Sequence, residues 1–224
     1  LNEGETAVSA EDVPTWVGLQ SGTIAATPTY ASLWDAPSYT TVISEPTDAP
    51  LTFENADLGY GYAIYETTLA AGQGGKLMAD CRDLGVVRVD GEFVGYLDRR
   101  TTWGWVEIEP ADHPRKLEIL VEALGRNHYA AFNDASKGLR GKPTLDKVPL
   151  SGWTMKTFNF LNWDDEKGAY ASEMDNLEFV ADANPSARSG SFYKYNVTLD
   201  PTKDALLDMR AWRRGMVCVN GTWV

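Results

Sequence analysis

Short stretches in which apolar and polar residues alternate recur along the chain, and they predict β-strands. In Lys116–Leu124, Leu117, Ile119 and Val121 alternate against charged positions, with the period of two that is typical of a strand. Aromatic and β-branched residues, which favour strands, dominate Tyr60–Leu69. Since no segment shows an amphipathic helix of three turns, the pattern predicts a β protein.

Two dipeptides predict tight hairpin turns. Asp90-Gly91 and Asn220-Gly221 each follow a valine-containing strand pattern, and both suit the two positive φ values of a type I′ turn. Short strands with Gly- and Pro-rich connections favour an antiparallel sandwich. We therefore predict an all-β fold made of jelly-roll β-sandwich units.

The chain contains an internal repeat at an offset of 130 residues. Tyr62–Val94 aligns without a gap on Phe192–Val224 with nine identities, and about two would be expected by chance. The alignment predicts two copies of one supersecondary unit. The alternative is two unrelated hairpins that share a valine-rich turn pattern. The identical pairs are Tyr65/Tyr195, Thr68/Thr198, Leu69/Leu199, Leu77/Leu207, Gly85/Gly215, Val87/Val217, Val89/Val219, Gly91/Gly221 and Val94/Val224.

The repeat suggests a domain organisation. We expect an N-terminal segment over 1–20, for which a linker is one interpretation, a first β-sandwich domain over 21–149 and a second over 150–224. The second copy ends at Val224, shortly after its turn, whereas the first is followed by further strands. A sandwich that stopped there would leave an open edge, so we expect the second domain to be truncated.

Composition excludes two classes of partner. The 224 residues carry a formal net charge of −12, which gives no positive field for a phosphate backbone, so we expect no nucleic acid partner. No stretch reaches the roughly 20 apolar residues of a membrane helix, so we expect no membrane partner. The N-terminal residues 1–14 show no signal segment, so the compartment stays open.

The residues that carry chemistry elsewhere are sparse here. His113 and His128 are the two histidines, and no GxSxG elbow is present, which argues against a serine hydrolase. Cys81 and Cys218 lack metal-ligand spacing, and they are either two free thiols or one disulfide. The run Asp164–Glu166 is typical of a solvated loop. We predict no metal and no cofactor.

Aromatic residues are the remaining candidates for binding, because their flat faces stack on sugar rings. Packing in the core is the commoner fate of Trp in a sandwich. Both interpretations stay open for Trp103, Trp105, Trp153, Trp163, Trp212 and Trp223.

Several segments, in order and spacing, resemble the C-terminal β-domains of glycoside hydrolase family 35 β-galactosidases. The most specific is GRNHYAAFNDASKG, over 125–138, and the others are LTFENADLGYGYAIYETTL, VVRVDGEFVGYLDR, LEILVEAL, LSGW and RRGMVCVNG. The sequence departs from the family pattern at Glu66, His128 and Ala130, where the family has Arg, Asn and Gly.

The resemblance implies a parent enzyme that hydrolyses terminal β-galactosides with retention. A TIM barrel that this chain lacks would supply two glutamates about 5 Å apart. This chain would then hold no catalytic residue; it would brace the barrel and close one side of the galactose pocket. The resemblance also implies a secreted, periplasmic or lysosomal location. The alternatives are a free-standing carbohydrate-binding jelly-roll module and a self-sufficient hydrolase.

The same resemblance implies which residues lie near the substrate. Tyr129 falls where the family has a tyrosine that lines the galactose pocket, and Arg126 and His128 would support its loop. A phenol offers a hydroxyl for a sugar hydroxyl and a ring for the pyranose. The alternative for Tyr129 is an ordinary tyrosine at the edge of the sandwich.

Overall fold

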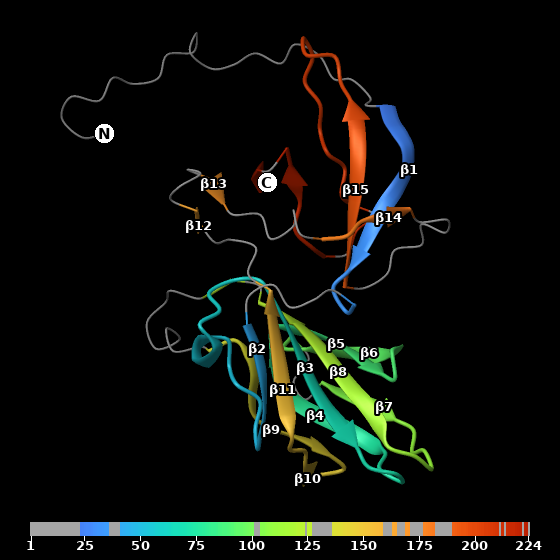
Figure 1. The fold of residues 1–224 in the computed structure, drawn as a ribbon, viewed down its shortest axis with the longest axis vertical. Coiled ribbons are helices and arrows are strands. Elements are labelled where there is room, and N and C mark those ends of the chain that lie inside the picture. The colour runs from blue at the N-terminus through green and yellow to red at the C-terminus, as the bar shows by residue number, and fades with distance from the viewer. Residues whose placement is uncertain are drawn as a thin grey trace, which may run out of the picture. The chain divides into compact units, whose positions relative to one another are not determined.

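The computed structural model describes residues 23–35, 41–100, 104–123, 125–126, 136–158, 163–164, 169–170, 177–181, 190–210, 212, 214–220 and 222–223. These residues form antiparallel strands and a 3-10 turn, η1 (Glu54–Ala56), so the predicted all-β class is confirmed (Figure 1). The chain divides into two compact units. The smaller contains residues 1–30, 179–185 and 193–224, and the larger contains 31–178 and 186–192.

The larger unit contains a six-stranded sheet and a four-stranded sheet, both antiparallel. The six-stranded sheet has the order β2 (Thr41–Thr47), β11 (Trp153–Phe158), β3 (Tyr62–Leu69), β8 (Arg115–Glu122), β5 (Leu84–Val89), β6 (Glu92–Asp98). The four-stranded sheet has the order β10 (Val148–Pro149), β9 (Gly138–Leu145), β4 (Gly75–Arg82), β7 (Trp105–Ile108). A short pair, β12 (Trp163–Asp164) and β13 (Ala169–Tyr170), belongs to the same unit.

An apolar cluster between the two sheets forms the main core of the larger unit among the residues described. Strands of both sheets contribute side chains to it, among them Tyr65, Leu77, Val106, Ile119 and Trp153. The polar groups of the buried Tyr65 and Trp153 side chains both form hydrogen bonds. The Tyr65 hydroxyl donates to the Leu51 carbonyl at 2.8 Å, and Trp153 Nε1 donates to the Leu150 carbonyl at 3.1 Å. Alternating strands thus bury one face against each other, as a sandwich requires.

The outer face of the six-stranded sheet is also buried at one end. Leu120 and Ile64, neighbours in the β3–β8 pairing, are both buried. Gly190 lies so close to Leu120 and Trp34 that a Cβ there would stand 2.8 Å from the first and 2.5 Å from the second. The close approach at Gly190 therefore requires glycine.

The hairpin β5–β6 has the predicted turn. Asp90 has φ 49° and Gly91 has φ 83°, and the Asp90 carboxylate accepts a hydrogen bond from the Lys116 backbone at 2.8 Å. A bulge between Val87 and Arg88 shifts the register of β6. The turn chemistry read from the sequence is confirmed.

The smaller unit contains a three-stranded sheet with the order β14 (Val180–Ala181), β1 (Thr23–Ser32), β15 (Ser191–Thr198), together with a hairpin, β16 (Cys218–Val219) and β17 (Thr222–Trp223). At the 130-residue offset, β15 corresponds to β3 and β16–β17 corresponds to β5–β6. Asn220 has the same φ, 49°, as Asp90. The two ends of the repeat therefore share secondary structure.

The middle of the repeat differs between the copies. Leu77 lies on β4 and is fully buried, whereas its counterpart Leu207 is 62% exposed and lies outside any described strand. Val219 is 49% exposed, whereas Val89 is buried. Identical residues thus occupy different environments, so the repeat does not extend to equivalent packing at these positions.

The compact units do not follow the expected boundary at residue 149. β11 lies beyond it, yet pairs with β2 and β3 in the six-stranded sheet, and β1 lies before it, yet pairs with β14 and β15. Strand pairing between distant segments determines the units, and local sequence pattern carries no signal of it.

Candidate functional site

The candidate site consists of the contacts that hold the residues on either side of segment 127–135. Gly125 and Arg126 follow β8, and Ser136 and Lys137 precede β9. His128 and Tyr129, two of the residues expected near a substrate, lie outside the described residues. The structure therefore describes what holds the ends of this segment.

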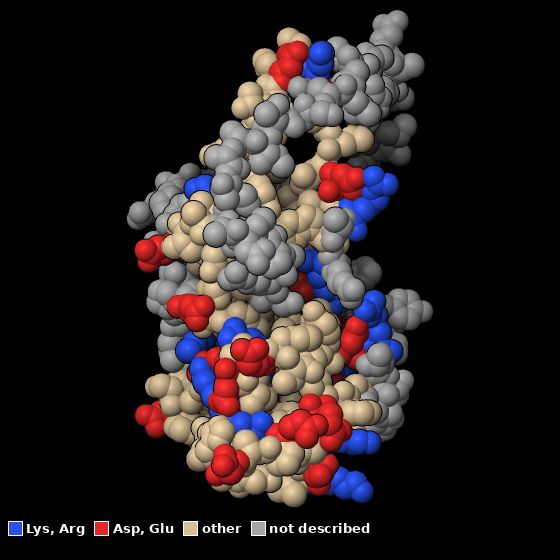
Figure 2. Space-filling view, turned by 90° about the vertical axis from the view of Figure 1, so that its right-hand side faces the viewer, with Lys and Arg blue, Asp and Glu red and all other residues tan. Residues whose placement is uncertain are grey.

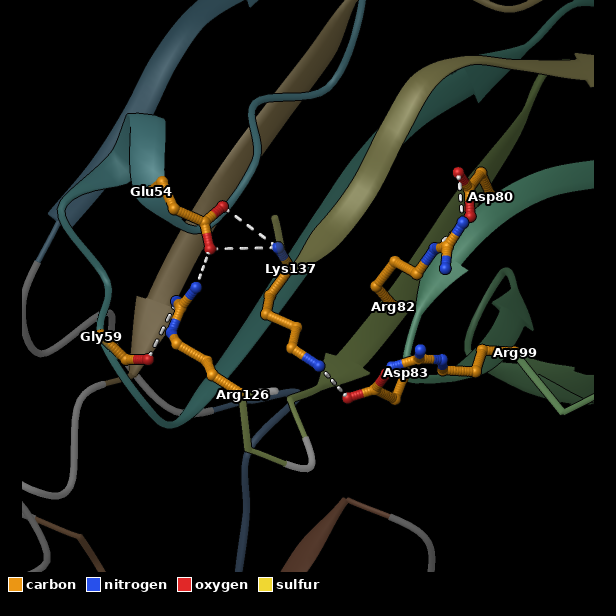
Figure 3. Close-up of polar contacts among 8 residues, drawn as sticks. All are labelled: Glu54, Gly59, Asp80, Arg82, Asp83, Arg99, Arg126 and Lys137. Atoms are coloured by element: carbon orange, nitrogen blue, oxygen red, sulfur yellow. Dashed lines mark hydrogen bonds and ion pairs between the residues drawn. The ribbon is translucent and has the colours of Figure 1, made fainter. Parts of the chain in front are cut away.

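Glu54 joins the two ends. Its carboxylate accepts a hydrogen bond from the Arg126 guanidinium, and it accepts the Lys137 backbone N–H at 3.1 Å to one oxygen and 3.0 Å to the other (Figure 3). Arg126 also donates to the Gly59 carbonyl at 3.2 Å. We call Glu54, Arg126 and the Lys137 backbone the end clamp. Residues 126 and 137 are thereby fixed to one carboxylate.

Backbone contacts hold the clamp in place. The Phe53 N–H donates to the Lys137 carbonyl at 2.9 Å, and Thr52 forms a β-bridge with Gly138. Gly138 has φ 92°, and a Cβ there would lie 2.2 Å from the Tyr65 hydroxyl and 2.8 Å from the Phe53 ring. Only glycine lets the chain enter β9 at this point, since both the backbone conformation and the space exclude a side chain.

The Lys137 side chain forms a second anchor together with Asp83 and Arg99. We call these three residues the buried trio. Its Nζ lies 2.7 Å from Asp83 Oδ2, and Arg99 Nη1 lies 2.6 Å from Asp83 Oδ1 (Figure 3). The Asp83 and Lys137 side chains are each 2% exposed. The trio links the start of β9 to Asp83, between β4 and β5, and to Arg99, directly after β6. A buried charge of this kind is tolerated only when it is paired.

The electrostatics of Glu54 favour its ionised form. Partial burial acts to raise the pKa of its carboxyl, but the hydrogen bonds from Arg126 and from the backbone outweigh it, so that the pKa lies below its usual value. Glu54 is therefore a carboxylate at neutral pH, held by a cation and amides. In this state it orients the Arg126 guanidinium and the Lys137 backbone N–H, and it cannot act as a proton donor.

Charges elsewhere on the surface are also paired locally. Arg82 lies 2.6 Å from Asp80, and Lys116 lies 2.7 Å from Glu66. Figure 2 shows basic and acidic side chains interspersed on one face of the molecule. Within the described ranges, no group of three or more His, Cys, Asp or Glu is placed to hold a metal ion. Among the same residues, no helix is long and apolar enough to span a membrane.

The two cysteines are both free, which leaves one of the two interpretations of Cys81 and Cys218. Cys81 is buried in the core, and burial raises the pKa of its thiol. Its role is that of a small apolar side chain.

Residues 50–159 match a family model described as "Beta-galactosidase, first all-beta domain". This region belongs to that domain family. The matched residues run from η1 to the end of β11, so the β-galactosidase domain contains both sheets' central strands, the end clamp and the buried trio.

Curated β-galactosidases resemble a longer part of the chain. The enzyme of Xanthomonas manihotis is 30% identical over 194 residues, which cover 85% of this chain and 29% of that protein. The enzyme of Mus musculus is 29% identical over 77% of this chain and 28% of its own length, and that of Homo sapiens is 26% identical over 77% and 27%. The chain thus spans less than a third of these β-galactosidases.

Sequence reasoning named Arg126 but missed Glu54, which binds Arg126, and the buried trio of the β-galactosidase domain. Glu54, Asp83 and Arg99 lie far from segment 127–135 in the sequence, and in a chain of net charge −12 an isolated acid is usually solvated. Lys137 lies inside the stretch GRNHYAAFNDASKG, and its place in this family-like stretch was the available sequence signal that it has a role. Its burial and its pairing with Asp83 depend on the fold and had no local signature.

Proposed function

We propose that this chain is a non-catalytic accessory region of a β-galactosidase-type glycoside hydrolase. It braces a catalytic barrel, supplied by another part of the enzyme, and closes one side of the pocket for a terminal β-galactoside. The β-galactosidase first all-β domain at 50–159 supports this proposal, as do curated relatives that are more than three times as long as the matched segment.

The end clamp is the observation that carries the proposal. An accessory domain that contributes one side chain to a pocket must hold that side chain in register with groups on another domain. Glu54 ties together Arg126 and Lys137, the residues that flank segment 127–135. In this proposal Tyr129 contacts the sugar, and Arg126 and His128 support its segment.

The test is a kinetic comparison in the complete enzyme. Tyr129→Phe removes one hydroxyl and keeps the ring, so kcat/KM for a galactoside should fall by a factor equivalent to about 1–2 kcal/mol, with an unchanged melting temperature. Tyr195→Phe is the matched control, because Tyr195 is 39% exposed on β15 and lies outside the family-matched residues 50–159. Wild-type kinetics for Tyr129→Phe would contradict the role of Tyr129.

A second candidate function is a carbohydrate-binding module that acts on its own. Exposed aromatic rings favour it: Phe93 and Tyr96 are 53% and 44% exposed on β6, and Trp105 is 49% exposed on β7. Sugar rings stack on such surfaces. Titration of the isolated chain with galactosides and oligosaccharides tests this function, and binding that Phe93→Ala or Trp105→Ala abolishes would establish it.

A further inference from the structure

A β-bulge brings two exposed aromatic rings to one face of β6. Phe93 and Tyr96 are three residues apart, so in a regular strand their side chains would point to opposite faces. The register of β5 and β6 skips Val94, so that Phe93 lies opposite Arg88. Tyr96 lies opposite Val86, on the same face of the sheet. The two rings are 53% and 44% exposed, with centroids 4.9 Å apart, and they form an aromatic platform at the edge of the six-stranded sheet (Figure 1).

Arg88, the neighbour of Phe93 across the hairpin, is held in place by a further aromatic ring. Its guanidinium Cζ lies 4.4 Å from the centroid of the Trp34 ring, and Trp34 is buried. Gly91 in the turn leaves room for the guanidinium, because a Cβ there would lie 2.9 Å from Arg88 Nη2. A stacked guanidinium is already oriented, so a ligand that binds it loses little affinity to ordering.

The guanidinium of Arg88 lacks an acceptor. Its neighbour on β8 is Glu118, but the Glu118 carboxylate binds the Lys116 ammonium at 2.8 Å. The Asp90 carboxylate accepts the Lys116 backbone N–H. Among the described residues no oxygen accepts a hydrogen bond from Arg88: its Nε is buried without a partner, whereas Nη1 and Nη2 stay accessible. Charged donors of this kind favour a ligand that carries an acceptor.

The surrounding charges favour an anionic acceptor. On the same face of the sheet, Glu66 and Glu118 both bind Lys116, and Glu66 also binds Lys156. Two carboxylates are thus balanced by two ammonium groups, and Arg88 adds a positive charge that none of them neutralises. The guanidinium fork matches the geometry of a carboxylate. Exposed aromatic rings beside it suit the apolar face of a sugar.

We propose that Arg88, Phe93 and Tyr96 form a binding site for a glycan that carries an acidic sugar, such as a uronic acid. The sugar ring packs on the aromatic platform, and its carboxylate accepts hydrogen bonds from Nη1 and Nη2 of Arg88. The site rests on the second candidate function, carbohydrate binding, and is independent of Tyr129 and of segment 127–135. A neutral sugar uses the rings alone, so the site distinguishes acidic from neutral sugars.

Two sugars that differ at one carbon test the site on the folded 224-residue chain. Methyl β-glucuronide carries a carboxylate where methyl β-glucoside carries a hydroxymethyl group. Titrations followed by ligand-observed NMR measure dissociation constants in the millimolar range for both. We expect the glucuronide to bind about tenfold more tightly, because its carboxylate gains charge-assisted hydrogen bonds. Arg88→Gln should abolish this difference, and Phe93→Ala should weaken the binding of both sugars.

Arg82→Gln and Trp105→Ala are the matched controls. Arg82 pairs with Asp80 at 2.6 Å on β4, and Trp105 is 49% exposed on β7. Because neither residue belongs to the site, both variants should keep the wild-type affinities. Arg88→Lys keeps the charge but loses the fork, so it should retain only part of the preference. Thermal melts show which variants are folded, and Arg88→Lys serves if Arg88→Gln fails to fold.

A preference for the glucuronide that disappears in Arg88→Gln and persists in Arg82→Gln would establish the site. Equal affinities for the two sugars, or a preference that survives Arg88→Gln, would overturn it. Binding that is lost in Trp105→Ala but not in Phe93→Ala would overturn the site and keep carbohydrate binding. Tighter binding of a short acidic peptide would assign the surface to a protein partner and overturn it as well. If neither sugar binds while Tyr129→Phe reduces kcat/KM, the site is wrong and the accessory role stands.

Discussion

The ammonium of Lys137 and the carboxylate of Asp83 form an ion pair of 2.7 Å in which both side chains are 2% exposed. Arg99 adds a second cation at 2.6 Å from the same carboxylate. Lys137 also donates its backbone N–H to Glu54. One residue therefore belongs to both anchors, and it connects the end clamp to the interior of the sandwich.

Removal of the Asp83 charge should destabilise the domain strongly. In Asp83→Asn the buried Lys137 ammonium loses its counter-charge, so the free energy of unfolding should fall by about 3–5 kcal/mol. Asp80→Asn is the control, because Asp80 lies three residues away, pairs with Arg82 at 2.6 Å and is 44% exposed. It should cost about 1 kcal/mol or less.

Urea unfolding of both variants provides the comparison. Equal effects of Asp83→Asn and Asp80→Asn would show that burial adds nothing to the importance of the Lys137–Asp83 pair. A double variant, Asp83→Leu with Lys137→Met, should recover part of the loss, because it removes both buried charges together.

Gly138 should tolerate no side chain. A Cβ at this position would lie 2.2 Å from the Tyr65 hydroxyl, and the backbone has φ 92°. Gly138→Ala should therefore reduce the free energy of unfolding by about 2–4 kcal/mol. Gly141→Ala shares the strained backbone, with φ 67°, but has no atom within 4 Å of its Cβ, so it should cost about 1 kcal/mol. Thermal melts of the two variants should rank them in this order, and the reverse order would refute the packing at Gly138.

Glu66 should make stability depend on pH in acid. Partial burial acts to raise its pKa, but Lys116 and Lys156 outweigh it and hold the pKa below its ordinary value of 4.5. A lowered pKa in the folded state means that the contribution is full above pH 4.5 and is lost as pH falls through the folded value.

The comparison is between wild type and Glu66→Gln. The difference in their free energies of unfolding should be largest at neutral pH, about 1 kcal/mol, and should shrink as the pH is lowered past 4. Chemical denaturation between pH 7 and pH 3 measures it. A difference that stays constant over this range would exclude Glu66 as the titrating group.

The sequence predicted those features that depend on neighbouring residues. The Asp90-Gly91 turn and the strands at 62–69 and 115–122 follow from turn chemistry and alternation, and the structure confirms them. The all-β class follows from the same signals. Jelly-roll connectivity of the two units stays a prediction.

Features that depend on distant residues were not predictable. β11 lies between β2 and β3, more than 80 residues away in the chain, because apolar faces match there and not because of any local signal. Glu54 and Lys137 are likewise separated by 83 residues. Hydrogen bonds of this kind become visible only once the strands that carry them are assembled.

The central claim, that this chain assists a β-galactosidase without performing the chemistry, is tested most directly by an assay of the purified chain on nitrophenyl β-galactoside. The same sample should show cooperative thermal unfolding, so that a lack of activity is not due to an unfolded chain. The account predicts no hydrolysis above the uncatalysed rate, because both catalytic carboxylates would lie in another part of the enzyme. Hydrolysis that copurifies with the folded chain and saturates with substrate would contradict it.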